Sequence, residues 1–352
     1  MRRLTRARRD RGAAATWVAL LIVPLLVVGA LGIDVGLVQV DRQRLQTGAD
    51  AAALAIATQC SRQVCTNTTN ALAAQDMATA NAPLVDPAYA TVDVIDRTEG
   101  YVEVTTTSTR DHFFGPVAGI DSSQLSATSG ARWGYPERGT VDPPLAISWC
   151  ALAAAVGTNV VRDLTGRIVG VDLPVAGQRS LLRSVGLNVT VCPGALVSSL
   201  GLSGLLQTLP FGFLAGPGCG STVVEVGAWV SQYPQTNAPA ACQPPNFAQY
   251  LGETLYLPVY SEIRLNNLTR TNQFRIYAFV AVTIHGYNLG NGIRSNPNPC
   301  PPTLLNPDPR CLDLSFELEL GIDSPSDDFE YGPGAPPIGD PRVQLVLPEE
   351  RP

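Results

Sequence analysis

The feature that most constrains this chain is an uncharged apolar run near its N-terminus. Residues Ala13–Ile33 form 21 consecutive positions without a charged side chain, interrupted only by Thr16, Pro24 and two glycines. A helix rises about 1.5 Å per residue, so this run covers roughly 30 Å, the thickness of a bilayer's hydrocarbon core. We therefore expect a membrane-spanning helix, which we assign to residues 13–40, and Pro24 is compatible with it because membrane helices tolerate proline.

Charge on either side of this run predicts its orientation. The first twelve residues contain six Arg and one Asp, a net charge of +5, whereas only Arg42, Arg44 and Arg62 follow soon after the run. Basic residues remain on the cytoplasmic side of a membrane helix. We therefore expect residues 1–12 to be a cytoplasmic basic segment and the rest of the chain to lie outside the cytoplasm.

A cleavable secretory signal has the same layout, and Val28-Gly29-Ala30 offers small residues for cleavage. Two observations favour an uncleaved anchor. The apolar run exceeds the roughly 7–15 residues of a signal's apolar region, and good helix formers continue without a turn signal from Asp34 to Ala57. A secreted or surface-displayed adhesion protein with a cleaved signal peptide is the alternative interpretation.

Small residues within the anchor suggest a surface for helix packing. Gly29 and Gly32 precede Gly36, and the Gly32-x-x-x-Gly36 spacing would let a second helix approach closely; small residues are also common in anchors that have no partner. Asp34 is expected at the outer membrane interface, and the alternative is a carboxylate tolerated by local water. The residues predicted for anchoring and helix packing are Trp17, Pro24, Gly29, Gly32, Asp34 and Gly36.

All of the cysteines follow the apolar run, where an oxidising compartment permits disulfides. Four bridges would use all eight, and sequence alone allows 105 pairings. Pairing of near neighbours is the simplest hypothesis, which gives Cys60 with Cys65, Cys150 with Cys192, Cys219 with Cys242, and Cys300 with Cys311.

The remaining pattern predicts an α+β fold with two extracytoplasmic parts. Residues 49–57 and 71–82 have helical character, and the alternating runs 91–96 and 101–109 predict a hairpin, giving a pilin-like subdomain of helix and small sheet at 41–135. Pro-rich residues 136–144 are typical of a linker. A second disulfide-rich α+β domain would cover 136–322, with a Pro- and acid-rich tail at 323–352 in which the VQLVL run could add an edge strand. We thus expect a membrane helix that continues into an extracytoplasmic helix, then a mixed or antiparallel β ectodomain.

Composition argues against an enzyme. All 24 basic residues are Arg, and a chain without Lys has neither the lysine of a P-loop nor a Schiff-base amine. The chain has just two histidines, His112 and His285, far from any cysteine cluster, so we expect no metal site and no cofactor. A net charge of -6 argues against nucleic acid as a partner. We expect no catalytic residues and no small-molecule substrate.

The N-terminal residues carry a family resemblance. An Arg-rich start with Gly-Ala, an apolar helix with proline, a Gly-x-Asp and the run LQTGADAAALA occur in that order. Together they resemble the N-terminal segment of TadE/TadG-like Flp pilus-assembly proteins. Farther along, PFGFLAGPGC and the paired runs LYLPVYSEI and FRIYAFVAVTIHGYNLG resemble stretches of actinobacterial TadG-like proteins in particular. The family-motif residues outside the anchor set are Gly12, Ala13, Leu45, Gln46, Ala49, Asp50 and Leu54.

This resemblance implies a membrane-anchored, pseudopilin-like component of the Tad (tight adherence) machinery, which assembles Flp pili. Its implied partners are the membrane, other Tad pilus-assembly proteins and the Flp pilin. Processed members of the wider family have Glu and an aromatic residue soon after the cleaved glycine. Here Gly12 is followed by Ala-Ala-Ala-Thr-Trp with no Glu, which argues against processing by a prepilin peptidase.

Overall fold

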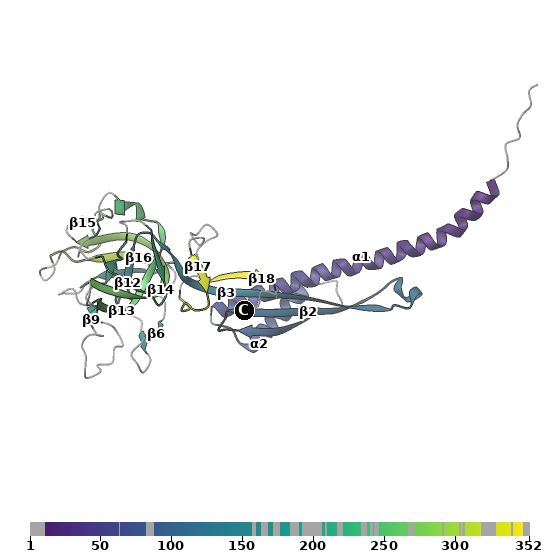
Figure 1. Cartoon of the computed structure of the whole chain (residues 1–352), viewed down its shortest axis with the longest axis horizontal. Coiled ribbons are helices and arrows are strands. Elements are labelled where there is room, and N and C mark those ends of the chain that lie inside the picture. The colour runs from purple at the N-terminus through teal and green to yellow at the C-terminus, as the bar shows by residue number, and fades with distance from the viewer. Residues whose placement is uncertain are drawn as a thin grey trace, which may run out of the picture. The chain divides into compact units, whose positions relative to one another are not determined.

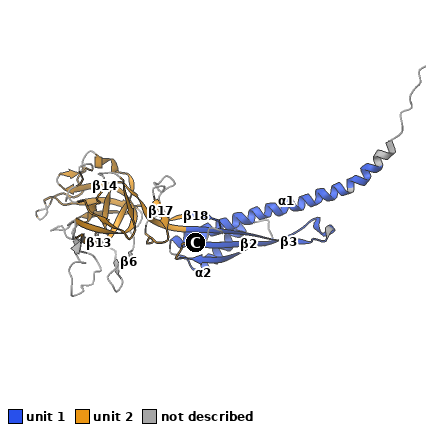
Figure 2. Cartoon of the chain, viewed as in Figure 1, with its two compact units in different colours: residues 1–97, 101–132, 343–352 blue, residues 98–100, 133–342 orange. Residues whose placement is uncertain are grey.

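The chain forms two compact units, which are coloured separately in Figure 2. Unit 1 comprises residues 1–97, 101–132 and 343–352, and unit 2 comprises residues 98–100 and 133–342. The computed structural model describes residues 11–62, 64–81, 88–156, 160–162, 168–171, 177–183, 190–191, 206–207, 210–216, 221–233, 238–239, 242, 246–266, 271–290, 292–302, 304, 307–317, 329–338 and 341–347.

Unit 1 combines a long helix with a small antiparallel sheet (Figure 1). Its sheet has the order β1-β2-β3, and β18 also pairs with β3. The elements are α1 (Arg11–Ser61), α2 (Asn67–Asn81), β1 (Tyr89–Asp96), β2 (Tyr101–Asp111), the 3-10 helix η1 (Gly115–Ala118), the first part of β3 (Ser122–Val141) and most of β18 (Arg342–Val346).

The helix α1 is continuous over 51 residues, so the apolar run and the following helical segment form one element. It ends at Ser61, next to the disulfide between Cys60 and Cys65. The expected second helix begins earlier than residue 71, because Thr66 caps it: the Thr66 hydroxyl accepts from the Thr69 N–H at 3.2 Å, and the Thr69 hydroxyl accepts from the Thr66 N–H at 3.1 Å.

The predicted hairpin is present, with β1 and β2 paired antiparallel from Tyr89 opposite Thr107 to Asp96 opposite Tyr101. Strand β2 then pairs with β3 over its whole length, from Tyr101 opposite Arg132 to Asp111 opposite Ser122. From Val102 to Ser108 every second residue of β2 is buried, including Val104 and Thr106. Successive side chains of a strand point to opposite faces of the sheet, so this alternation indicates that one face of β2 packs against a helix.

Unit 2 is rich in β-structure. Its main sheet has the order β10-β4-β13-β14-β16-β7 among the described residues, with β12 and β15 also paired to β14. The elements are β4 (Leu145–Ser148), α3 (Trp149–Val156), β5 (Val160–Arg162), β6 (Ile168–Val171), β7 (Arg179–Arg183), β8 (Thr190–Val191), β9 (Leu206–Gln207), β10 (Phe211–Phe213), β11 (Thr222–Glu225), β12 (Trp229–Ser231), η4 (Asn246–Tyr250), β13 (Thr254–Asn266), β14 (Thr271–Gly290), β15 (Ile293–Arg294), β16 (Cys311–Phe316) and β17 (Phe329–Gly332).

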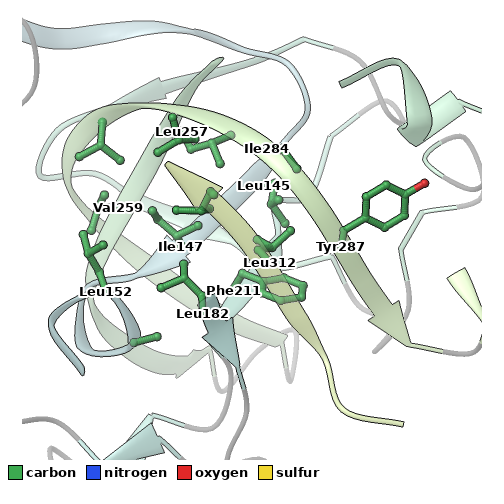
Figure 3. Close-up of a cluster of buried hydrophobic side chains, with 14 of the residues drawn as sticks. Leu145, Ile147, Leu152, Leu182, Phe211, Leu257, Val259, Ile284, Tyr287 and Leu312 are labelled. Atoms are coloured by element: carbon green, nitrogen blue, oxygen red, sulfur yellow. The ribbon is translucent and has the colours of Figure 1, made fainter. Parts of the chain in front are cut away.

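This sheet is mixed, as expected, because β13 runs parallel to β4 and antiparallel to β14. The central strands β13 and β14 are buried on both faces. Leu257 and Val280 belong to the cluster shown in Figure 3, whereas Tyr256 and Phe279 belong to a second cluster. Burial on both faces explains why the middle of β14, residues 276–282, is continuously apolar instead of alternating.

Two segments differ from the sequence-based expectation. Residues 136–144, expected as a linker, include the end of β3, which pairs with β11 from Arg138 to Val141. Pro136 is accommodated beside a register shift in the pairing with β17. The C-terminal residues, expected mainly as a tail, supply β17, whose Phe329 is buried in the second cluster of unit 2. They also supply β18, which coincides with the VQLVL run that could add an edge strand.

Two of the near-neighbour disulfides are present, Cys60–Cys65 in unit 1 and Cys300–Cys311 in unit 2. Cys242 is also disulfide-bonded. Cys192, Cys219 and the side chain of Cys150 lie outside the described residues, and so do their pairings.

Candidate functional site

The N-terminal half of α1 exposes a long apolar surface. Trp17 is 66% exposed and Leu25 72% exposed, and large apolar side chains remain exposed as far as Val35 and Val40. Soluble proteins rarely expose a continuous apolar patch of this size. Among the described residues, α1 is the one helix long and apolar enough to cross a membrane, a test that a signal sequence near the N-terminus also passes.

The predicted packing ridge lies open on this surface. A methyl group added to Gly29, Gly32 or Gly36 would meet no atom within 4 Å, so nothing in the described chain occupies the ridge. Pro24 is also exposed and lies inside the continuous helix. Gly12 and Ala13 lie in α1, but their side chains are outside the described set.

Asp34, expected at the membrane interface, has a role that sequence reasoning missed. Its side chain is buried, with 5% of its surface exposed. The carboxylate accepts three backbone hydrogen bonds, from the N–H groups of Phe113 at 3.0 Å, Phe114 at 2.9 Å and Gly115 at 2.8 Å. Asp34 therefore fixes the β2–β3 connection against α1. No sequence signal links positions about 80 residues apart.

The connection held by Asp34 is strongly apolar. We call residues 112–121 the hairpin tip. Phe113 and Val117 are exposed by 72% and 84%, and Phe114 and Ile120 are exposed as well. Gly119 has a φ of 80°, a left-handed conformation that favours glycine at this turn.

A groove of about 800 Å³ lies between the hairpin tip and α1. From the tip, Phe114 and Val117 line it, and α1 contributes the residues Leu25, Leu26, Val27, Gly29, Ala30, Leu31 and Ile33. All of these residues belong to unit 1. The groove is therefore an apolar recess beside the last turns of the apolar run Ala13–Ile33.

Farther along α1, the family-motif residues pack inside unit 1. Leu45 is fully buried with Leu125 and Ala88, and its carbonyl accepts from the Thr106 hydroxyl of β2 at 2.9 Å. Gln46 donates to the Asp50 carboxylate at 2.8 Å. This part of the motif joins α1 to the sheet.

The alanines of the motif bring α2 close to α1. Ala49 and the alanines one turn farther on are fully buried, and so is Ala74 of α2. A methyl group on Gly48 would lie 3.3 Å from the Cα of Ala78, closer than most side-chain contacts. Small residues on both helices therefore set the short distance between them. Leu54 follows the buried alanines directly in α1 and is only partly buried.

An ion pair completes the contact between α1 and the hairpin. Asp41 is 1% exposed, and Arg110 of β2 approaches its carboxylate at 2.9 Å. Arg44, one turn along α1, is 3.5 Å away. A buried carboxylate needs such partners because desolvation disfavours an isolated charge.

The histidines have structural hydrogen bonds. The His112 ring bonds to the Ser123 hydroxyl at 2.7 Å across the base of the hairpin tip, and the His285 ring bonds to the Ser315 hydroxyl at 2.8 Å. Within the described ranges, no three His, Cys, Asp or Glu residues gather as metal ligands would.

Residues 12–59 match the family model described as putative Flp pilus-assembly TadE/G-like. They form a TadE/G-like segment. The TadE/G-like segment covers nearly all of α1, from the exposed apolar surface to the buried alanines and Leu54. Comparison of the chain with curated proteins finds no match. Comparison with solved structures finds none either.

The position of the TadE/G-like segment explains its composition physically. Its first half presents apolar side chains and an open glycine ridge, and its second half carries the small and polar residues that bind α2, β2 and β3. The change between the two halves occurs at Asp34 and Asp41, which are both buried against the β2–β3 hairpin.

Proposed function

We propose that this chain is a membrane-anchored, pseudopilin-like component of the Tad machinery that assembles Flp pili, and that it acts through protein contacts without catalysis. In this proposal the N-terminal part of α1 crosses the membrane with its N-terminus in the cytoplasm, and the rest of the described chain lies outside. The observation that carries it is the TadE/G-like match on residues 12–59, the same residues that expose the apolar surface.

The proposed partners are other Tad pilus-assembly proteins, with the Flp pilin as a further candidate. Contacts within the membrane would use the Gly29, Gly32 and Gly36 ridge, since small residues let helix backbones approach closely. The ridge is free of contacts from the rest of the described chain, which supports this assignment.

A matched pair of variants tests the proposal in the source cell. Gly32→Leu fills the ridge, whereas Ala19→Leu adds a leucine to the same exposed helix on another face, about 140° around the axis from Gly32 at 100° per residue. Each is introduced into a strain that lacks the wild-type chain, and Flp pili are counted by electron microscopy. We expect pili to be lost with Gly32→Leu and kept with Ala19→Leu, with equal amounts of both proteins in the membrane fraction. Normal piliation in the strain without the chain would refute the pilus-assembly role.

In the alternative, a secreted adhesion protein, the apolar run is a signal peptide that is cleaved from the mature chain. Mass spectrometry of the mature N-terminus separates the two functions. A chain that retains residues 13–33 and resists alkaline carbonate extraction supports the anchor, and a mature chain that begins near Leu31 supports secretion.

A further inference from the structure

The hairpin tip is an unexpected apolar projection on a strand connection. Four of its side chains, those of Phe113, Phe114, Val117 and Ile120, are exposed. A connection between two strands ordinarily faces water and is polar. We propose that this tip inserts into the outer leaflet of the bilayer beside α1, as a second membrane contact whose occupant is lipid acyl chains. The proposal rests on the membrane-anchor part of the proposed function.

Position along α1 is the first support. Phe114 and Val117 line one groove with α1 residues from Leu25 to Ile33. At about 1.5 Å per residue, those α1 residues span roughly 12 Å at the outer end of the apolar run. In Figure 1 the β2–β3 hairpin extends in the same direction as the N-terminal half of α1. If α1 is in the bilayer, the tip is therefore at the depth of its outer leaflet.

Backbone hydrogen bonding is the second support. Polar backbone groups can enter hydrocarbon only when they have internal partners. The Asp34 carboxylate accepts from three consecutive N–H groups, 113 to 115. Residue 116 is proline, and the N–H groups of Val117, Gly119 and Ile120 donate to carbonyls within the tip at 3.0–3.1 Å. These N–H donors all have hydrogen-bond partners within the protein and need no water, which is the condition for placing a loop in the bilayer.

Charge limits the depth of insertion. Asp111 precedes the tip and Asp121 is its last residue; both are exposed, and Arg110 lies directly before Asp111. The guanidinium of Arg110 is held by Asp41. Charged side chains are costly in the bilayer core but favourable at its interface. The polar boundary at residues 110–111 and 121 would therefore lie at the headgroups with the buried Asp34 carboxylate, and the side chains of Phe113, Phe114, Val117 and Ile120 would reach into the acyl region.

A second protein helix could also fill the groove, and the exposed side chains argue against it. A helix seated there would cover Phe114 and Val117, which line the groove, but not Phe113 and Ile120, which are exposed and do not line it. Lipid surrounds all four. The lipid interpretation accounts for the whole apolar tip, and a helix accounts for half of it.

Site-directed spin labelling of the full chain in vesicles tests the inference. No cysteine of the described residues is free, and the unsubstituted chain treated with the same reagent measures background labelling. Nitroxides are placed by Val117→Cys at the tip, Leu25→Cys on α1 and Leu72→Cys on the exposed face of α2, in phosphatidylethanolamine–phosphatidylglycerol vesicles. Collision with oxygen reports lipid exposure, and collision with nickel ethylenediaminediacetate reports water exposure. Ile120→Cys is a second tip site in case Val117→Cys does not fold.

We expect the labels at 117 and 25 to collide more with oxygen than with the nickel complex, and the label at 72 to show the reverse. A label at 25 in lipid with a label at 117 in water would overturn tip insertion and leave the anchor intact. A label at 25 in water would overturn the anchor itself, and the insertion with it. A label at 117 shielded from both reagents would show a protein occupant and would also overturn the lipid assignment.

Discussion

Replacing Leu45 with alanine tests whether the family motif acts as a packing element of unit 1. Leu45 is fully buried in a small cluster with Leu125 and Ala88, beside the partly buried Val38. Truncating a buried leucine costs about 2–5 kcal/mol, and the cost is lower where the surroundings can close over the cavity. Because this cluster is small and has partly exposed neighbours, we expect a loss of about 3 kcal/mol in the free energy of unfolding of unit 1.

Leu54→Ala is the matched control. Leu54 belongs to the same motif and the same helix, so the change in helix propensity is identical. It is only partly buried, and we expect a loss of about 1 kcal/mol, in proportion to the smaller apolar area removed from water.

Hydrogen exchange of the full chain in detergent micelles, read by mass spectrometry, measures both losses. A chain with two compact units need not unfold in one step, and exchange reports the opening free energy of each region separately. Peptides from residues 101–111 of β2 should lose more protection with Leu45→Ala than with Leu54→Ala. Equal losses, or a loss under about 1 kcal/mol for Leu45→Ala, would refute the packing role. Loss of piliation without any loss of protection would place Leu45 in a contact with a partner instead.

Three further outcomes follow from the structure. Arg110→Met leaves the buried Asp41 without its ion-pair partner at 2.9 Å. The free energy of unfolding of unit 1 should fall by about 2 kcal/mol, a value between those for exposed and buried ion pairs. Adding Asp41→Asn should recover part of the lost exchange protection. Replacing Cys300 and Cys311 with serine opens a disulfide loop with a sequence separation of 11. The free energy of unfolding of unit 2 should fall by about 3 kcal/mol, and hydrogen exchange in unit 1 should not change. Unchanged hydrogen exchange in unit 2 would contradict this prediction. Burial raises the pKa of Tyr135 from its ordinary value of 10.0 to about 12. The unfolded state therefore loses this proton first, so the stability contribution is complete below pH 10 and is lost as pH rises through about 12. Absorbance at 295 nm across that range should show a late tyrosinate step; Tyr135→Phe should reduce its amplitude and leave the part due to Tyr250, whose pKa burial likewise raises to about 12.

Local patterns made several parts of unit 1 predictable. The length of the apolar run gave the continuous helix through Ala57, and alternation in 91–96 and 101–109 gave the hairpin. Cys60 and Cys65 are near neighbours, so their pairing needed no knowledge of the fold. In each case the physical cause acts between residues close in sequence.

The site was less predictable because its contacts join distant residues. Asp34 was identified as an interfacial carboxylate, but its three N–H donors lie 79 to 81 positions away. The exposed tip side chains show no periodicity that would separate them from a buried bend. In the same way, β17 joins β3 across almost 200 residues, so a Pro- and acid-rich segment that lacks a strand signal still forms one.

By itself the sequence determined that a long apolar helix begins the described chain, that strands and short disulfide loops follow it, and that no lysine chemistry is available. Only the tertiary structure decided that Asp34 holds an apolar tip beside that helix and that β14 is buried on both faces. Helix length and strand alternation follow from backbone geometry over a few residues. Which faces meet depends on which surfaces, far apart in sequence, bury apolar area and satisfy backbone groups together.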